Sequence, residues 1–181
     1  MSRIAIPTRD EAPAASRSVL DAVSAQLGVV PNLFRLVALS PPALAGMTSL
    51  SGALAKTLDV KTRERLAIAT AQVNGCDYCL SAHTYLGLNL AKISPEEIAL
   101  NRQGASADPK ADAAVRFGTK VAQTRGKVSD AAIAAVKMAG FTEAQVIEIV
   151  AVVAESFLTN LINNVAETDI DFPVIRTAEA A

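Results

Sequence analysis

Helix start and stop signals recur along the whole chain, and this recurrence most constrains what the chain can fold into. Ser94, Asp108 and Ser129 are residues that cap helix N-termini, and each precedes a periodic apolar segment. Proline follows Ser94 and Asp108 at the first helical position, where its missing N–H costs nothing. No stretch alternates apolar and polar residues over the length of a strand. The sequence therefore predicts an all-α protein of about eight or nine helices with short loops.

The same signals give approximate bounds for each helix. Gly28 should stop the first helix, a capping box is expected over Ser94–Glu97, and Thr142 with Gln145 should open the longest helix. The tail from Thr168 should be an extended end, either packed or frayed. The predicted helices cover residues 13–27, 31–39, 41–56, 61–74, 76–89, 95 onward, 109–124, 129–140 and 142–167.

Length and composition predict one folded domain over residues 1–181. The chain is 51% apolar and 19% charged, which is typical of a protein with a packed core. Its 17 basic and 18 acidic residues nearly cancel, and it has no basic run, so a nucleic-acid partner is not expected.

A membrane partner is not expected either. The N-terminus lacks the uninterrupted apolar region of a secretory signal. The most apolar segment starts at Val146, carries Glu148 and Glu155, and is expected to be too short to span a bilayer. The sequence therefore predicts a soluble cytoplasmic protein, in whose reducing surroundings cysteines serve catalysis or metal binding more often than structural disulfides.

The segment over residues 64–83 holds the only two cysteines and the only histidine. Cys76 and Cys79 are three residues apart, and His83 follows Cys79 by four. Residues at these spacings share one face of a helix, here within an arc of roughly 60°. A dithiol with an adjacent base suggests thiol redox chemistry, for which the reactive cysteine must be a thiolate.

The residues alone do not rank the two thiols. The dipole of a helix that begins at Cys76 would favour a thiolate there, whereas a proton-accepting His83 favours Cys79. Glu64, twelve residues before Cys76, could orient His83 or take the proton onward. Tyr78 lies between the cysteines and serves either packing or the site.

Simpler interpretations of these residues remain open. The cysteines could be small core residues, or with His83 they could form three ligands of a zinc site that needs a fourth. A thioredoxin fold is disfavoured because no strand precedes Cys76. A protein disulfide oxidoreductase, and a non-enzymatic redox-sensing or zinc-binding helical oligomer, are the alternative functions.

A second segment repeats the spacing of the first. Glu148, Asn160 and Asn163 stand at the intervals of Glu64 and the two cysteines, and Glu167 takes the place of His83. The pattern reflects either coincidence or duplication. Asparagines cannot themselves carry redox chemistry.

The glutamate, the C-x-Y-C-x-x-x-H motif and the preceding Asn-Gly resemble the signature of alkylhydroperoxidase D, of the carboxymuconolactone decarboxylase superfamily. VPNLFRLVALSPPAL before the motif and AGFTEAQVIEIVAVVAESFLTNLINNVAETDIDFP after it are similar to the peroxidase-related branch. The resemblance covers about residues 28–175. It implies an AhpD-like all-α domain that forms homo-oligomers. Decarboxylases of the superfamily lack the C-x-x-C, which makes that activity unexpected here.

The resemblance also implies a role for each site residue. Cys79 would be oxidised by the hydroperoxide to a sulfenic acid, and Cys76 would resolve it to a disulfide. His83 and Glu64 would form the proton relay, and Tyr78 matches the tyrosine of the motif. No cofactor or metal is implied beyond the redox-active disulfide. A thioredoxin-like or lipoyl-bearing electron donor would reduce it, and a hydroperoxide is the implied substrate. The Ala- and Leu-rich helices imply apolar surroundings, which favour an organic hydroperoxide.

Overall fold

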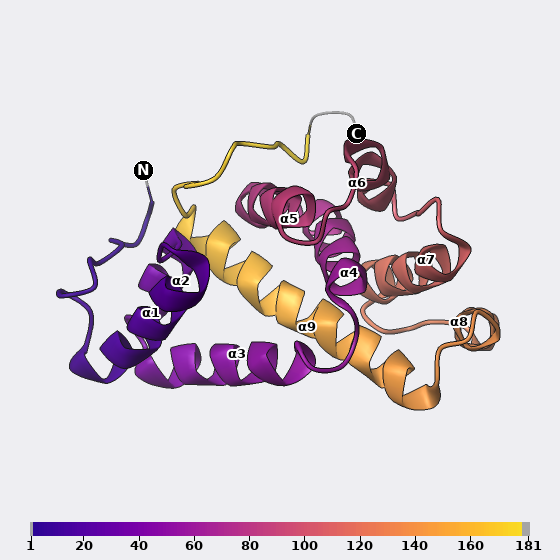
Figure 1. The fold of residues 1–181 in the computed structure, drawn as a ribbon, viewed down its shortest axis with the longest axis horizontal. Helices are drawn as coiled ribbons and strands as arrows, with labels where there is room; N and C mark the ends of the chain where they lie inside the picture. The colour runs from indigo at the N-terminus through magenta and orange to yellow at the C-terminus, as the bar shows by residue number, and fades with distance from the viewer. Residues whose placement is uncertain (1, 179–181) are drawn as a thin grey trace.

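The computed structural model describes residues 2–178, and over that span the chain forms nine α-helices and no strand (Figure 1). The prediction of an all-α fold is therefore confirmed. The helices are α1 (Ala14–Leu27), α2 (Asn32–Val37), α3 (Pro41–Leu54), α4 (Val60–Val73), α5 (Asp77–Asn89), α6 (Pro95–Arg102), α7 (Pro109–Thr124), α8 (Asp130–Met138) and α9 (Glu143–Ala166).

Side-chain caps fix most of the helix starts where the sequence predicted them. The Asp59 carboxylate accepts a hydrogen bond from the Thr62 N–H at 3.0 Å. Thr142 and Gln145 form a complete capping box at the start of α9, with bonds of 3.2 and 3.0 Å. These bonds satisfy amide donors that a helix leaves unpaired in its first turn.

Several predicted bounds were wrong by a few residues. Pro13 and Pro31 are the capping residues and not the first helical ones, and α2 and α3 end at Val37 and Leu54.

The capping box expected at Ser94 is only half formed. Ser94 Oγ accepts from the Glu97 N–H at 3.2 Å, as expected. The Glu97 carboxylate does not return to the cap, because it accepts instead from Arg65 Nε at 3.0 Å and from the Ser106 hydroxyl. An ion pair shielded from water outweighs an exposed capping bond here.

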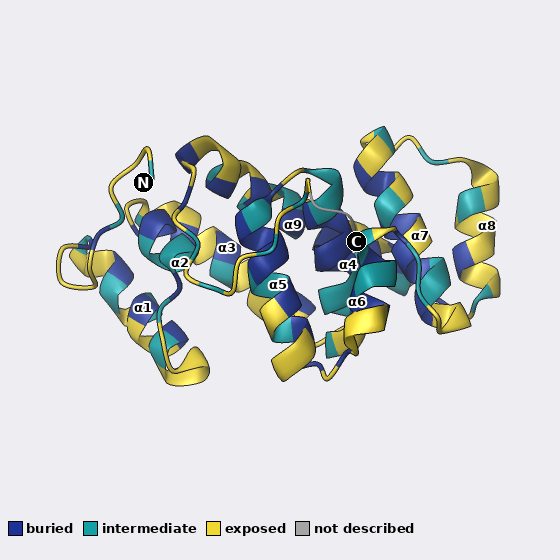
Figure 2. Cartoon of the chain, turned by 90° about the horizontal axis from the view of Figure 1, so that it is seen from above, coloured by how far each residue is buried: buried dark blue, intermediate teal, exposed yellow. Residues whose placement is uncertain are grey.

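Helix α9 runs through the middle of the molecule, and most other helices pack around it (Figure 1). It contacts α3, α4, α5, α7 and α8, while α4 also contacts α5, α6 and α7. Buried positions concentrate on these central helices, whereas α1 and α8 show exposed outer faces (Figure 2). The core at the α4–α7–α9 junction includes Leu66, Phe117, Ile149 and Val153.

The 24 residues of α9 make it long and apolar enough to cross a membrane by length and composition. The expectation that this apolar region is too short was therefore wrong, because the helix extends on both sides of the segment counted. Within the fold, Val146, Ile149, Val152 and Val153 of α9 are core residues. A long apolar helix at the centre of a helical protein passes the same test of length and composition as a membrane span.

The tail after α9 is packed across α5 over residues 168–178. The Ile175 N–H donates to Ser81 Oγ at 2.9 Å, and the Thr177 N–H donates to Asp77 Oδ1 at 2.8 Å. The described part of the tail is therefore packed and not frayed. Residues 179–181, the end of the predicted tail, lie outside the described residues.

Candidate active site

A tight turn between α4 and α5 brings the predicted site residues together. Helix α4 ends at Val73, and Gly75 makes the turn with φ of 63°, a left-handed conformation that favours glycine. Cys76 then caps α5. Because α5 folds back along α4, the His83 ring meets the Glu64 carboxylate, with Nδ1 and Oε2 2.8 Å apart.

Both thiols are buried and reduced. Cys76 is 0% exposed and Cys79 is 2% exposed, and they form no disulfide. The Cys79 N–H donates to Cys76 Sγ at 3.3 Å, so the sulfur of Cys76 takes the place of a capping oxygen. The two sulfurs thus lie one turn apart at the N-terminus of a helix, where negative charge is stabilised.

The environment shifts the pKa values of the two thiols in opposite directions. Burial would raise the pKa of Cys79, but a hydrogen bond from Cys76, the charge of His83 and the amides of Asn163 and Asn160 lower that pKa to about 6. For Cys76, the hydrogen bond to the Cys79 sulfur and burial both raise the pKa. Cys79 is therefore the thiolate at neutral pH and Cys76 the thiol, a ranking that the helix dipole alone would reverse.

His83 is held in its charged form. Burial would lower its pKa, but the charge and hydrogen bond of Glu64, together with the Cys79 thiolate, raise it to about 9. Nδ1 is occupied by Glu64, which leaves Nε2 for proton exchange. At neutral pH the site holds a thiolate beside an imidazolium, and the Glu64 side chain orients the imidazolium ring.

Two asparagines on α9 join the site, and sequence reasoning did not assign them to it. The Asn163 Nδ2 donates to Cys79 Sγ at 3.2 Å, and Asn160 Oδ1 accepts from Asn74 Nδ2 at 2.8 Å. Both α9 asparagines are almost fully buried. The signal available in the sequence was the repeated spacing, which placed amides in an otherwise apolar helix.

The hydroxyl of Tyr78 is bound to two other segments. It donates to Asp171 Oδ1 at 2.8 Å and accepts from the Leu33 N–H at 3.0 Å. Its ring packs edge-on against Phe172, with centroids 5.9 Å apart. These contacts join α5 to α2 and to the tail; a catalytic role for Tyr78 stays a prediction.

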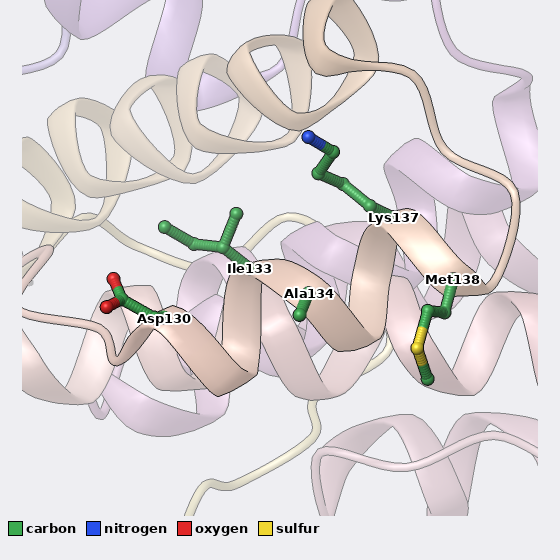
Figure 3. A pocket seen from close by; sticks show the side chains of 5 residues that line it. All are labelled: Asp130, Ile133, Ala134, Lys137 and Met138. Atoms are coloured by element: carbon green, nitrogen blue, oxygen red, sulfur yellow. The ribbon is translucent and has the colours of Figure 1, made fainter.

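A polar cleft of about 620 Å³ lies between the start of α5, the end of α9 and the tail. Its lining includes Gly75, Tyr78 and Asn163, together with Asp169, Val174 and Arg176 from the tail region, and neither cysteine is among the lining residues. A second hollow, of about 380 Å³, lies on α8 between residues such as Ile133, Lys137 and Met138 (Figure 3). None of the residues that line this hollow belongs to the thiol site. Asn163, which lines the cleft and donates to Cys79 Sγ, connects the cleft to the thiol site.

Among residues 2–178, no group of three or more His, Cys, Asp or Glu side chains is arranged to hold a metal ion. The three ligands that the sequence offered for zinc have other partners in the structure. The Cys79 N–H donates a hydrogen bond to Cys76 Sγ, and the His83 ring is hydrogen-bonded to the Glu64 carboxylate.

Comparisons with known proteins agree on the fold. Residues 41–120, which include Glu64, both cysteines and His83, match the Carboxymuconolactone decarboxylase family. A search of curated proteins found no significant match. Among solved structures, an alkylhydroperoxidase AhpD core described as an uncharacterized peroxidase-related protein, from Ralstonia eutropha JMP134, has 27% sequence identity and a TM-score of 0.83. The alignment covers 94% of this chain and 92% of that one.

Two further neighbours share the fold at lower identity. An uncharacterized peroxidase-related protein from Silicibacter sp. TM1040 has 21% identity and a TM-score of 0.81, with 93% and 91% of the two chains covered. The debrominase Bmp8, in complex with 2,3,4-tribromopyrrole, has 17% identity and a TM-score of 0.78, with 94% of each chain covered. At these identities the likeness extends to the fold alone.

Proposed function

From the match of residues 41–120 to the carboxymuconolactone decarboxylase family and from the AhpD-like fold, we propose that this chain is a thiol-dependent peroxidase that reduces organic hydroperoxides. One observation carries the proposal. Cys79 is a buried thiolate beside an imidazolium that Glu64 holds in place. That pair supplies both a nucleophile and a proton donor, the two groups that reduction of a peroxide needs.

In the first step, the Cys79 thiolate attacks the terminal oxygen of the hydroperoxide. A sulfur–oxygen bond forms, the oxygen–oxygen bond breaks, and the sulfur is oxidised to a sulfenic acid. The leaving alkoxide takes a proton from the His83 imidazolium and departs as an alcohol. The Glu64 carboxylate stabilises the imidazolium beforehand and keeps the ring oriented.

In the second step, Cys76 attacks the sulfenic sulfur. Neutral His83 accepts the Cys76 proton, and that proton leaves with the hydroxyl group as water while the disulfide forms. The raised pKa of Cys76 suits this order, because a second thiolate beside Cys79 would be repelled before oxidation. No cofactor enters either step.

An external dithiol would return the disulfide to its reduced state by exchange. We propose a thioredoxin-like or lipoyl-bearing donor in a reducing compartment such as the cytoplasm. It would attack from the polar cleft that Gly75 and Tyr78 line.

A homo-oligomer belongs to the same proposal. One side of α9 exposes an apolar stripe at helical spacing, made of Ile147, Val150, Leu158, Leu161 and Val165. A monomer rarely leaves such a stripe in contact with water. Light scattering should find an oligomer, and Leu161→Glu should reduce its size, whereas Met138→Glu on α8 should not.

The activity test mixes reduced protein with one equivalent of cumene hydroperoxide and follows both partners. Intact mass should show loss of two hydrogens as one peroxide is consumed. Cys79→Ser should abolish the reaction, whereas Cys76→Ser should complete one turnover and gain one oxygen. Thiols that survive excess peroxide would overturn the proposal, and equal damage by both substitutions would overturn the assigned roles.

A second assay on the reduced protein distinguishes a peroxidase from a protein disulfide oxidoreductase. A protein disulfide oxidoreductase would reduce insulin or a mixed disulfide much faster than it consumes peroxide. We expect the opposite order here, because the His83 imidazolium beside Cys79 supplies the proton that a leaving alkoxide needs.

A further inference from the structure

Two buried amides meet at the reactive sulfur. Asn160 and Asn163 stand three residues apart on the face of α9 that packs toward α5, and they are 1% and 2% exposed. The Asn163 Nδ2 donates to Cys79 Sγ at 3.2 Å. A thiolate offers only lone pairs, so the donor end of this amide is the end that must face it.

The amide of Asn160 is also fixed and also lies near the sulfur. Its Oδ1 is held by Asn74 Nδ2 at 2.8 Å, which leaves Nδ2 as its free end. This amide helps to lower the pKa of Cys79, although its Nδ2 makes no well-aligned hydrogen bond. The Nδ2 donor of Asn160 therefore lies near the Cys79 sulfur without a hydrogen bond to it. It is available to an atom that becomes bound to that sulfur.

Each asparagine keeps one buried polar atom without a hydrogen-bond partner among the described residues. These atoms are Asn160 Nδ2, a donor, and Asn163 Oδ1, an acceptor. Burying an unpaired polar group is unfavourable, and such groups in a folded protein call for an explanation. One donor and one acceptor beside a sulfur match the needs of a hydroxyl group on that sulfur.

We propose that Asn160 and Asn163 are catalytic residues that receive the oxygen atom transferred to Cys79. This inference rests on the proposed peroxidase function. As the sulfur–oxygen bond forms and the oxygen–oxygen bond breaks, Asn160 Nδ2 donates to the transferred oxygen. Asn163 Oδ1 accepts the hydrogen of the resulting sulfenic acid, while Asn163 Nδ2 stays on the sulfur. The electrons and protons follow the two steps described above, and no other reactant is needed.

The position of Asn163 supports this role. It lines the polar cleft and contacts Cys79, so it stands between the approach and the reacting atom. A hydroperoxide entering from the cleft would meet the amide before the thiolate. Donors placed where charge develops in a transition state speed reactions because they need no reorganisation.

The test uses Asn160→Ala, Asn163→Ala and the isosteric Asn163→Asp in full-length reduced protein, each also combined with Cys76→Ser. Alkylation by iodoacetamide across pH gives the pKa of Cys79 without any peroxide. The rate with cumene hydroperoxide is then measured at a pH where Cys79 is fully ionised in every variant. In the Cys76→Ser forms, the lifetime of the sulfenic acid is followed by mass. Asn101→Ala removes another buried amide, one bound to Glu97 and to the Ala105 carbonyl, and serves as the matched control.

We expect both Asn163 variants to raise the pKa of Cys79, with the larger rise for aspartate because its carboxylate repels the thiolate. With the thiolate fully formed, Asn160→Ala and Asn163→Ala should still react with peroxide about 10²-fold more slowly, at the low end of the range measured for lost donors of this kind. The sulfenic acid should also be shorter-lived. Asn101→Ala should weaken folding and leave the pKa of Cys79 and the peroxide rate unchanged.

Two results would overturn the inference. If wild-type protein reacts with peroxide and both alanine variants react at the same rate when fully ionised, the asparagines have no role in oxygen transfer, and the peroxidase proposal stands. If wild-type Cys79 is alkylated normally but does not react with peroxide, the proposed function fails and the oxygen site fails with it.

Discussion

His83 Nδ1 and Glu64 Oε2 lie 2.8 Å apart, although the residues belong to different helices and are separated by 19 positions. The contact depends on the turn at Gly75, which folds α5 back along α4. Both side chains are largely shielded, with exposed fractions of 28% and 12%. The pair therefore acts in a setting where charges interact more strongly than in water.

Glu64→Gln should remove the charge that keeps His83 protonated. The pKa of His83 should fall from about 9 toward its ordinary value of about 6.5, because burial is then opposed only by the charges of Cys79 and Glu155. The rate of peroxide reduction at neutral pH should fall by about 10²-fold, the low end of what a positioned acid–base group contributes. Stopped-flow measurement of peroxide consumption checks this. Glu143→Gln, at an exposed carboxylate on α9, is the control and should keep the wild-type rate.

The wild-type rate should follow a bell-shaped pH profile. Below a pH of about 6 the Cys79 thiolate becomes protonated, so the rate should drop by about tenfold per pH unit. Above a pH of about 9 His83 loses its proton, and the alkoxide loses its proton donor. Second-order rate constants with cumene hydroperoxide between pH 4.5 and 10.5, a range of roughly 1.5 units beyond each limb, test the profile. A rate that keeps rising through pH 9 would argue against His83 as the acid.

Tyr78→Phe should loosen the tail without removing the aromatic packing. The substitution leaves the Leu33 N–H and the Asp171 carboxylate without their shared partner, at a cost of about 1–3 kcal/mol of the free energy of unfolding. Urea denaturation measures the loss, and hydrogen exchange should show faster exchange over residues 169–177. Tyr85→Phe, at a more exposed ring that also contacts Phe172, should change stability by less than about 0.5 kcal/mol. Unchanged exchange in the tail would contradict the anchoring role of Tyr78.

Local signals in the sequence were sufficient to predict where the helices start and that the two cysteines and His83 share one helix face. Caps such as Asp59 and Thr142 act within three residues, so a helix start depends on neighbours that the sequence shows directly. The shared face of Cys76, Cys79 and His83 follows from helical geometry in the same way.

Contacts between distant segments could not be found in this way. Asn163 reaches Cys79 across 84 positions, and the Glu97 carboxylate leaves its expected cap for Arg65, 32 positions away. The residues alone left the ranking of the two thiols open for the same reason. The helix dipole favoured Cys76 and His83 favoured Cys79, and the amides from α9 that also lower the pKa of Cys79 come from a distant segment.

The close packing of α4 against α7 gives a final prediction about stability. A Cβ added at Gly118 would overlap Leu66 Cδ2, a buried core atom only two residues after Glu64. Gly118→Ala should therefore cost about 1–3 kcal/mol, since neither helix can move without disturbing the core.

Gly46→Ala is the matched control, because Gly46 is an exposed position inside α3 with no atom within 4 Å of an added Cβ. It should stabilise the protein by about 0.5–1 kcal/mol, since alanine loses less backbone entropy in a helix. Thermal unfolding of both variants gives the comparison, and opposite signs are expected. If Gly118→Ala were as stable as wild type, the Leu66 side chain would have to turn away from α7 without loss of packing, contrary to the tight core described here.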